Sequence, residues 1–331
     1  MIEKHYVLAC GALWDFWVLP HQGVFHLYYL QTEQDVPPQN QRRWAIGHAV
    51  SSDLLSWTPC GVVLRADAAA GHPGLATGSC VMYGGQGVMA LTACAGGESL
   101  PGIAPYSDYG IAFARSDDLY HWRLDGAPRT FPQRAPFEGR EDAALRPPGC
   151  HCFGDPFLYT LAGDDGLHML LNARLQDGEV RTRAAVAHTR TKDLQRFSPL
   201  HPLLAPGIAM RLETPQLFEK HGRWYLLASC HDALLSPAFF QERGIGALGA
   251  AALVFTADAP DGPFALRGDF ALFCGEGCYI CKAVPQADAL LTIVSTATQY
   301  PPRQGETGIS QPYRIAFPAE GGIRVLGPLG C

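Results

Sequence analysis

The chain has 331 residues, a formal net charge of −6 and only 17% charged residues, whereas 47% of its residues are hydrophobic. This acidic balance argues against a nucleic-acid partner, and no apolar run approaches the roughly 20 residues that a membrane span requires. The 36 glycines and 26 prolines favour many short strands joined by tight turns, so we expect an all-β fold.

The start of the chain and its cysteines indicate a compartment. Residues 1–6 lack the basic start and apolar run of a signal peptide, and strand-like sequence follows at once. Eleven is an odd number of cysteines, which favours free thiols over a disulfide framework, so we expect a cytoplasmic protein. The spacing Cys274-x3-Cys278-x2-Cys281 also occurs in metal sites, but no matching His or Cys pair follows it. We therefore expect buried thiols, no metal and no other cofactor.

Pairs of strand-like runs separated by turn residues recur along the chain and predict β-hairpins. The expected pairs are 13–19 with 24–31, 76–83 with 87–93, 153–161 with 167–173, and 212–219 with 223–230. A fifth unit is expected over 279–284, 289–296 and 313–316. Asp155 precedes a proline, which is confined to strand starts, edges and bulges, so Asp155 should lie at the entrance of its strand.

A shared signature follows the first four hairpins: an alternating small and apolar strand, a Ser/Thr-x-Asp-Leu turn, and an aromatic residue, with the fourth copy degenerate. The aromatic residues recur at intervals of 65, 75 and 67 residues, at Trp57, Trp122, Phe197 and Phe264. About five such units fill the chain. Radial closure of these units predicts a five-bladed β-propeller, a single domain over residues 1–331. We interpret the Asp-Leu-aromatic motif as a structural turn.

The innermost strand of each propeller unit lines the central channel, so polar residues in these strands converge. The first strands of units one, three and four carry Asp15, Asp155 and Glu213, and unit two offers Thr77 and Ser79. Each carboxylate alone could be a cap or turn residue. Because carboxylates are seldom buried without a partner or a purpose, three in register predict a shared site.

Three clustered carboxylates suit glycoside hydrolysis. One must be protonated to protonate the leaving oxygen, while another stays ionised as nucleophile or as the base that activates water. Burial and mutual repulsion separate their pKa values. Trp14, Trp17 and Trp44 could supply apolar faces for a sugar ring, although core packing explains them almost as well.

These motifs resemble the five-bladed propeller glycoside hydrolases, most closely the β-fructofuranosidases of glycoside hydrolase family 32, with related propellers in families 43 and 68. The resemblance implies that Asp15 is the nucleophile, Asp155 stabilises the transition state and Glu213 is the general acid/base. Residues 26–31, 44–50 and 77–79 are similar to the sugar-binding strands of the family. The residues expected to bind substrate are Trp14, Gln31, Trp44, Thr77 and Ser79.

The chain departs from the family pattern in two places. The Asn and Pro that flank the nucleophile are Trp14 and Phe16 here, and Gly154 replaces the substrate-binding arginine. Loss of that fork-shaped donor removes bidentate contacts to sugar hydroxyls, for which Arg140 or Arg146 are candidate substitutes. Because five units use up the chain, we do not expect the C-terminal β-sandwich of the family.

The expected function is a glycoside hydrolase that cleaves or transfers a furanosyl-type, fructofuranoside-like sugar with retention, and its partner is a small carbohydrate or glycoside. Two alternatives stay open: an inverting arabinofuranosidase or xylosidase like those of family 43, and a non-catalytic sugar-binding propeller. Phosphorolysis would need a cationic site beside Glu213, where only Arg211 is basic. Other candidates fare worse: Glu141 and Asp142 suit a solvated loop, and the spacing of His48, His151 and His188 matches no compact metal site.

Overall fold

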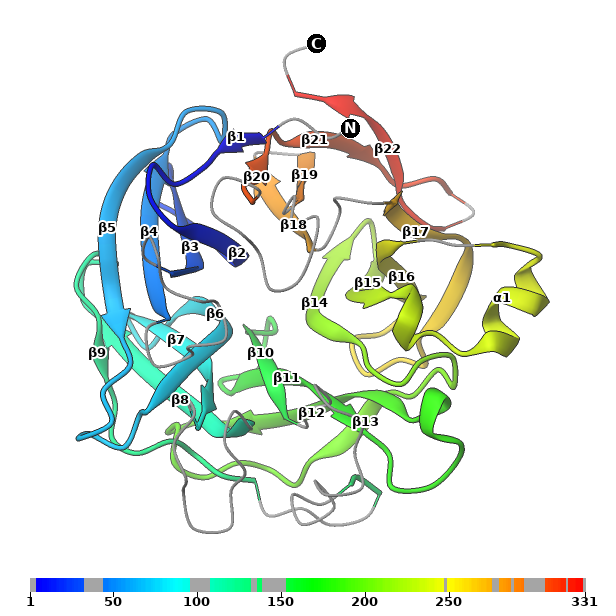
Figure 1. The fold of residues 1–331 in the computed structure, drawn as a ribbon, viewed down its shortest axis with the longest axis horizontal. Coiled ribbons are helices and arrows are strands. Elements are labelled where there is room, and N and C mark those ends of the chain that lie inside the picture. The colour runs from blue at the N-terminus through cyan, green and yellow to red at the C-terminus, as the bar shows by residue number, and fades with distance from the viewer. Residues whose placement is uncertain are drawn as a thin grey trace.

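The computed structural model describes residues 4–32, 44–95, 108–131, 136–138, 153–246, 249–275, 280–286, 289–294, 307–319 and 321–329. Within these ranges the regular structure is almost entirely β-strand, with one seven-residue α-helix, α1 (Pro237–Arg243). No helix in these ranges is long and apolar enough to cross a membrane. The strands form five four-stranded antiparallel sheets and one two-stranded pair (Figure 1).

The sheets follow one another along the chain. The first contains β2 (Ala12–His21), β3 (Val24–Thr32), β4 (Ala45–Ser51) and β5 (Thr58–Arg65). The second contains β6 (Gly74–Tyr83), β7 (Gln86–Cys94), β8 (Asp108–Ser116) and β9 (Arg123–Leu124). The third contains β10 (Gly154–Tyr159), β11 (Leu167–Arg174), β12 (Ala184–Thr191) and β13 (His201–Leu204). The fourth contains β14 (Glu213–Lys220), β15 (Arg223–His231), β16 (Ala250–Ala257) and β17 (Ala265–Gly275). The fifth contains β18 (Cys281–Gln286), β19 (Ala289–Val294), β21 (Tyr313–Ala316) and β22 (Arg324–Pro328).

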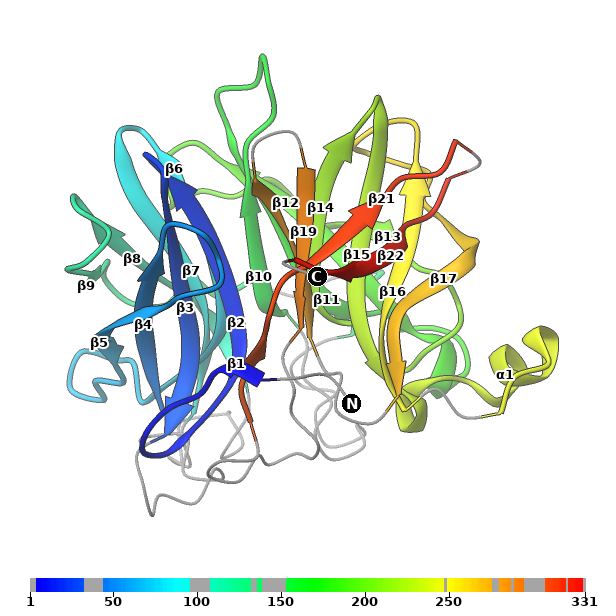
Figure 2. The ribbon, with the colours of Figure 1, turned by 90° about the horizontal axis from the view of Figure 1, so that it is seen from above.

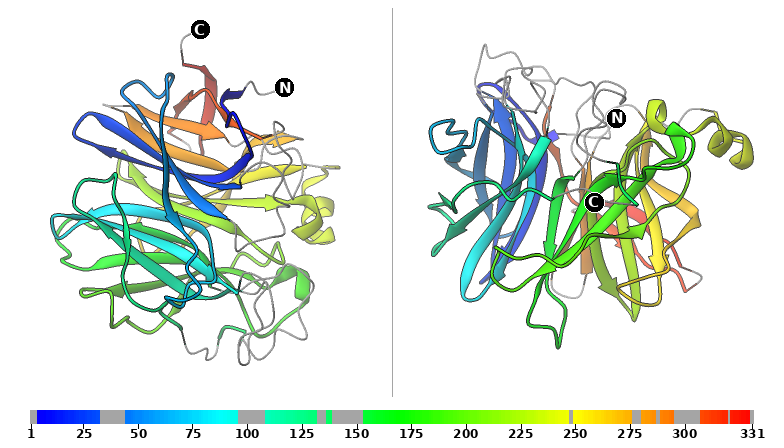
Figure 3. Two further views of the ribbon diagram at one scale, coloured as in Figure 1. Left: turned by 60° about the vertical axis from the view of Figure 1, so that its left-hand side comes forward. Right: turned by 90° about the horizontal axis from the view of Figure 1, so that it is seen from below.

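The first strand of each sheet lies nearest the centre of the molecule, and the later strands lie progressively outward (Figure 1). Strands β2, β6, β10 and β14 contact one another in that order, and β18 contacts both β2 and β15. The sheets therefore close into a ring with their strands running roughly along its axis (Figure 2). Helix α1 projects outside this ring (Figure 3). The all-β propeller expected from the sequence is confirmed.

Apolar side chains fill the spaces between successive sheets. The described residues form five hydrophobic clusters, and each combines residues from two neighbouring sheets. The cluster between the fifth and first sheets includes Tyr6 and Ile309. Their strands, β1 (Lys4–Tyr6) and β20 (Ile309–Ser310), pair antiparallel and add a hydrogen-bonded link where the ring closes. Burial of these clusters is the dominant force that holds the sheets together.

The repeated Asp-Leu turn is structural, as its hydrogen bonds show. Oγ of Ser51 accepts from the backbone N–H of Leu54 (2.9 Å), and Oδ1 of Asp53 accepts from the N–H groups of the next two residues after Leu54 (2.8 Å each). The same pattern recurs at Ser116 with Asp118 and at Thr191 with Asp193. The leucine in each turn has a positive φ and a buried side chain: Leu54 (64°), Leu119 (67°) and Leu194 (60°).

Candidate active site

The three predicted carboxylates occupy corresponding places in three inner strands. Asp15, Asp155 and Glu213 lie near the starts of β2, β10 and β14, and each is at most 8% exposed. The register of each inner strand against the next strand shifts at this level, a bulge that redirects side chains. The shifts fall between Leu13 and Phe16, between Gly154 and Phe157, and between Glu213 and Gln216.

Electrostatic coupling and one arginine connect the three groups. The negative charges of Asp155 and Glu213 both raise the pKa of Asp15. Nε of Arg211 lies 3.0 Å from Oε1 of Glu213, and its Nη2 lies 4.0 Å from Oδ2 of Asp155. The ring thus brings together carboxylates that are about 60 to 200 residues apart in the sequence.

Asp155 is held from three directions. Its backbone N–H donates to Oγ1 of Thr92 (2.8 Å). Its Oδ2 accepts from Nδ2 of Asn172 (2.8 Å) and from the backbone N–H of Thr214 (3.0 Å). Both Asp155 and Thr214 have positive φ angles, 50° and 48°, which non-glycine residues seldom adopt. Such strained backbone gathers at functional sites, where surrounding contacts enforce it.

Asp15 combines burial with few hydrogen bonds. The Thr77 hydroxyl donates to its Oδ2, whereas its buried Oδ1 has no hydrogen-bond partner among the described residues. Burial, followed by the charge of Asp155, raises the pKa of Asp15 to about 7, against the lowering effects of Thr77 and Lys282. Asp15 is therefore a site carboxylate with a raised pKa. It titrates near neutral pH with one oxygen still available.

Two basic residues at this site were missed as functional candidates. The sequence prediction looked to Arg140 or Arg146 for the cation missing at Gly154, but both lie outside the described residues. Arg211, whose side chain is 14% exposed, contacts Glu213 and Asp155 instead. The second is Lys282 on β18, which is 6% exposed and whose Nζ donates to the carbonyl oxygen of Thr214 (2.8 Å).

The sequence contains a signal for Lys282. It lies in an apolar inner-strand stretch, as Asp15 does, and a lysine is rarely buried without a counter-charge. The sequence analysis considered only the cysteines of this stretch and did not predict a role for Lys282. Burial lowers the pKa of Lys282 to about 8, although the charges of Asp155 and Asp15 act in the opposite direction.

The predicted aromatic residues pack against each other. The rings of Trp14 and Trp44 meet edge to face with centroids 5.1 Å apart, and only 2% and 4% of the two residues is exposed. Both belong to the cluster between the first two sheets, as does Trp17. Core packing accounts for their positions, and contact with sugar stays a prediction.

Gln31 lies at the end of the strand that faces the Asp15 bulge. It pairs with Leu13 across β2 and β3 and is half-buried. A Cβ atom on Gly47 would collide with the ring of Tyr29 and would stand 2.6 Å from Oε1 of Gln31, so glycine at this position leaves room for both side chains. The side chain of Gln31 is thereby fitted closely between two strands near Asp15.

The two predicted hydroxyl residues of β6 have different partners. Thr77 lies in a register shift between Leu75 and Gly78 and donates to Asp15. Ser79 accepts the backbone N–H of Leu158 (2.8 Å) and so links the second and third inner strands. Thr77 therefore belongs to the carboxylate cluster, whereas Ser79 supports the scaffold beside it.

The remaining candidates do not form a site in the described part of the chain. His48 bonds His26 (3.1 Å) and His188 bonds His168 (3.0 Å), each between neighbouring strands. Across the described residues no group of three or more His, Cys, Asp or Glu side chains could hold a metal ion. The predictions on Glu141, Asp142, His151 and Cys278 fall outside the described residues, as does the side chain of Cys274; Cys281 is buried.

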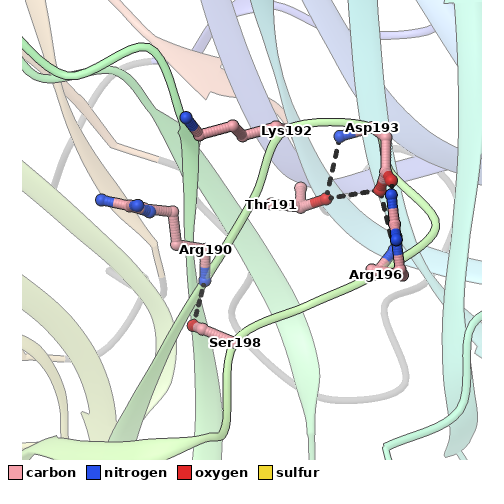
Figure 4. A pocket seen from close by; sticks show the side chains of 6 residues that line it. All are labelled: Arg190, Thr191, Lys192, Asp193, Arg196 and Ser198. Carbon is pink, nitrogen blue, oxygen red and sulfur yellow. Dashed lines mark hydrogen bonds and ion pairs between the residues drawn. The ribbon is translucent and has the colours of Figure 1, made fainter.

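One surface hollow of about 260 Å³ lies at the turn after β12 (Figure 4). Its lining residues are Arg190, Thr191, Lys192, Asp193, Arg196 and Ser198. Its basic side chains are paired with carboxylates, in the pairs Arg190–Asp164 (2.7 Å), Lys192–Asp165 (2.7 Å) and Arg196–Asp193 (3.1 Å). This hollow lies beside the Asp-Leu turn of the third sheet, and none of the three site carboxylates lines it.

Comparison with known proteins supports the resemblance inferred from the motifs. The sequence pattern of the glycosyl hydrolases family 32 N-terminal domain matches residues 17–99, a span that begins just after Asp15. No protein of curated function matches the chain in sequence.

Solved structures share the fold over the whole chain. Inulosucrase from Halalkalicoccus jeotgali bound to kestose superposes with a TM-score of 0.75 at 18% identity, covering 99% of this chain and 93% of that chain. Bacillus subtilis levansucrase in complex with oligosaccharides gives 0.76 at 12% identity, with 99% and 89% covered. A family 32 β-fructofuranosidase from Bombyx mori gives 0.67 at 16% identity, with 100% and 65% covered. The chain thus resembles the propeller glycoside hydrolases in fold throughout, and family 32 in sequence over residues 17–99.

Proposed function

We propose that the protein cleaves or transfers a furanosyl sugar of the fructofuranoside type, and that its five sheets act as the five blades of one catalytic unit. The observation that carries this proposal is the meeting of Asp15, Asp155 and Glu213, with Arg211 against the last two, in a ring that resembles fructan-handling enzymes. Paired carboxylates are the usual machinery of glycosidic cleavage.

Asp15 is suited to be the nucleophile. Its Oδ2 is engaged by the Thr77 hydroxyl, so Oδ1 is the oxygen left to form a bond to the anomeric carbon. As that bond forms, the glycosidic C–O bond breaks and Glu213 gives its proton to the leaving oxygen. Glu213 then takes a proton from water, or from a sugar hydroxyl, whose oxygen displaces Asp15 and restores the free enzyme.

Asp155 is suited to stabilise the charge that develops on the sugar ring. It takes no proton in this scheme, because Asn172 and Thr214 already donate to its Oδ2. A fixed carboxylate in a low-dielectric site stabilises developing positive charge without reorganising during the reaction. Arg211 sets the relative position of Asp155 and Glu213. It also supplies a cation at the site, where Gly154 replaces the arginine of the family pattern.

The pKa of Asp15 makes the assignment testable by pH. A nucleophile must be ionised, so with a pKa of about 7 the value of kcat/KM should rise as pH increases through 7. If Asp15 were instead the proton donor, kcat/KM would fall through the same range. Whether kcat/KM rises or falls as the pH increases through 7 therefore distinguishes Asp15 as nucleophile from Asp15 as proton donor.

The experiment is a ¹³C NMR time course of the anomeric carbon during incubation with sucrose, kestose, an aryl arabinofuranoside and an aryl xyloside. Asp15→Asn and Glu213→Gln should abolish turnover, whereas Asp117→Asn, an exposed carboxylate paired with Arg123, should leave it unchanged. We expect initial retention with a fructofuranoside. Initial inversion would make Asp15 a base, and binding of sugar without any turnover would leave a sugar-binding propeller.

A further inference from the structure

The fifth sheet contributes one charged group to the centre of the ring. Lys282 is on β18, between Cys281 and Ala283, and all three residues are buried. The pairing of β18 with β19 continues without a register shift from Cys281 to Gln286, unlike the pairing of the other four inner strands. Lys282 is therefore held on a regular strand.

Two contacts join this strand to the strand that carries Glu213. Nζ of Lys282 donates to the carbonyl oxygen of Thr214 (2.8 Å), the residue directly after Glu213. The Gln216 amide exchanges two hydrogen bonds with the backbone of Ala283, donating to its carbonyl oxygen and accepting from its N–H at 2.8 Å each. The Glu213 bulge is thereby fixed from the side of the fifth sheet.

The charges around Asp15 come from several elements. Asp155 on β10 and Glu213 on β14 both act to raise the pKa of Asp15, and the Thr77 hydroxyl on β6 donates to its Oδ2. Lys282 on β18 acts on Asp15 with the opposite sign. The other cation, Arg211 in the segment before β14, lies against Glu213 and Asp155. Arg211 therefore lies against Glu213 and Asp155, whereas the charge of Lys282 interacts with Asp155 and Asp15.

We propose that Lys282 is a positioning residue of the candidate active site, which fixes the Glu213–Thr214 bulge through its hydrogen bond to Thr214 and places a positive charge beside Asp155 and Asp15. This role rests on the proposed glycosidase function. Lys282 itself forms no bond to substrate in the scheme. Its positive charge offsets part of the repulsion that Asp155 and Glu213 exert on Asp15.

The test compares Lys282→Met with Lys282→Arg, and with Lys192→Met, which removes an exposed lysine paired with Asp165. Loss of the buried cation should move the acidic limb of kcat/KM to higher pH by about one unit, and should lower kcat about tenfold or more with a smaller change in KM. Lys282→Arg should keep the limb near its original position, and Lys192→Met should change nothing. A uniform loss of rate in Lys282→Met, with the limb unmoved, would overturn the proposal.

A second readout does not depend on turnover. The ¹³C signal of the Asp15 carboxyl, assigned by its loss in Asp15→Asn, should titrate at higher pH in Lys282→Met than in the wild-type protein. If no sugar is turned over but this titration still moves, the proposed function fails while the electrostatic role of Lys282 stands. An unmoved titration in an active enzyme overturns the role alone. Should Lys282→Met not fold, Lys282→Gln provides the same comparison.

Discussion

Nε of Arg211 lies 3.0 Å from Oε1 of Glu213, and the same guanidinium reaches within 4.0 Å of Oδ2 of Asp155. One planar cation thus contacts the candidate acid/base and the carboxylate expected to stabilise the sugar. Because arginine cannot lose its charge in a protein, the positive partner of both contacts is present across the whole working pH range. It fixes the spacing of two groups that come from different sheets.

Replacement of Arg211 by Met should lower kcat/KM about 100-fold and destabilise the protein by about 3 kcal/mol, since it leaves two buried carboxylates without their cation. Arg211→Lys keeps the positive charge but loses the forked guanidinium, so its kcat/KM and stability should lie between those of the wild-type protein and Arg211→Met. Steady-state kinetics and urea unfolding measure both effects. The control is Arg196→Met, at an exposed pair with Asp193. Near wild-type activity in Arg211→Met would contradict the bridging role.

Asn172 supports Asp155 with both ends of its amide. Nδ2 donates to Oδ2 of Asp155 (2.8 Å), and Oδ1 accepts from the N–H of Gly154 (2.9 Å). Asn172→Ala removes the acceptor of the Gly154 N–H and one of the donors to Oδ2 of Asp155, and should cost about 2 to 4 kcal/mol of unfolding free energy. The rate should also fall because Asp155 loses its orientation. Urea unfolding and steady-state kinetics of the same preparation test this prediction. An unchanged unfolding free energy together with an unchanged rate would refute the role of Asn172 in supporting Asp155.

Asp15 should make the stability of the protein depend on pH. Its pKa is raised from 3.8 to about 7 in the folded state, so the stability present below about pH 4 is lost as pH rises through 7. Asp15→Asn removes the buried charge and should be more stable than the wild-type protein at pH 8 by about 2 to 4 kcal/mol. Denaturant unfolding at several pH values should show this advantage shrinking toward pH 4. A constant difference would contradict the raised pKa.

The Asp-Leu turn predicts an unusual order of mutants at Leu54. This side chain is fully buried, yet its backbone has φ of 64°. Leu54→Ala and Leu54→Gly should each cost about 2 to 5 kcal/mol for the lost side chain. Glycine relieves the left-handed backbone, so Leu54→Gly should be the more stable of the two by about 0.5 to 1 kcal/mol. Urea unfolding decides, and a more stable alanine variant would show that the turn is unstrained.

The repeated pattern of apolar runs and turn residues was sufficient to predict the sheets, and to predict that the three carboxylates lie near the starts of inner strands. The hairpins expected around Asp15, Asp155 and Glu213 are present, because alternating apolar runs between turn residues have few other ways to bury one face. Radial closure then follows from the repeat. The same reasoning correctly treated the Asp53 turn as architecture.

The details of the site depend on features that periodicity does not encode. The bulges that orient the carboxylates are visible only as register shifts between paired strands. The positive φ angles of Asp155 and Thr214 could not be expected from the sequence, because neither residue is glycine. Arg211 precedes its strand, and Lys282 sits beside cysteines. The ring also places Arg211 near Asp155, 56 positions away, and Lys282 near Asp15, 267 positions away in the sequence.

The central claim is that Asp15 attacks the sugar and Glu213 transfers the proton. The most direct test is to incubate Glu213→Gln with an aryl fructofuranoside, whose leaving group needs no acid, and to map the protein by mass spectrometry. A glycosyl-enzyme should accumulate on the peptide that contains Asp15, since the variant lacks the base that activates water. Turnover with inversion and no adduct, or an adduct on another residue, would contradict the account.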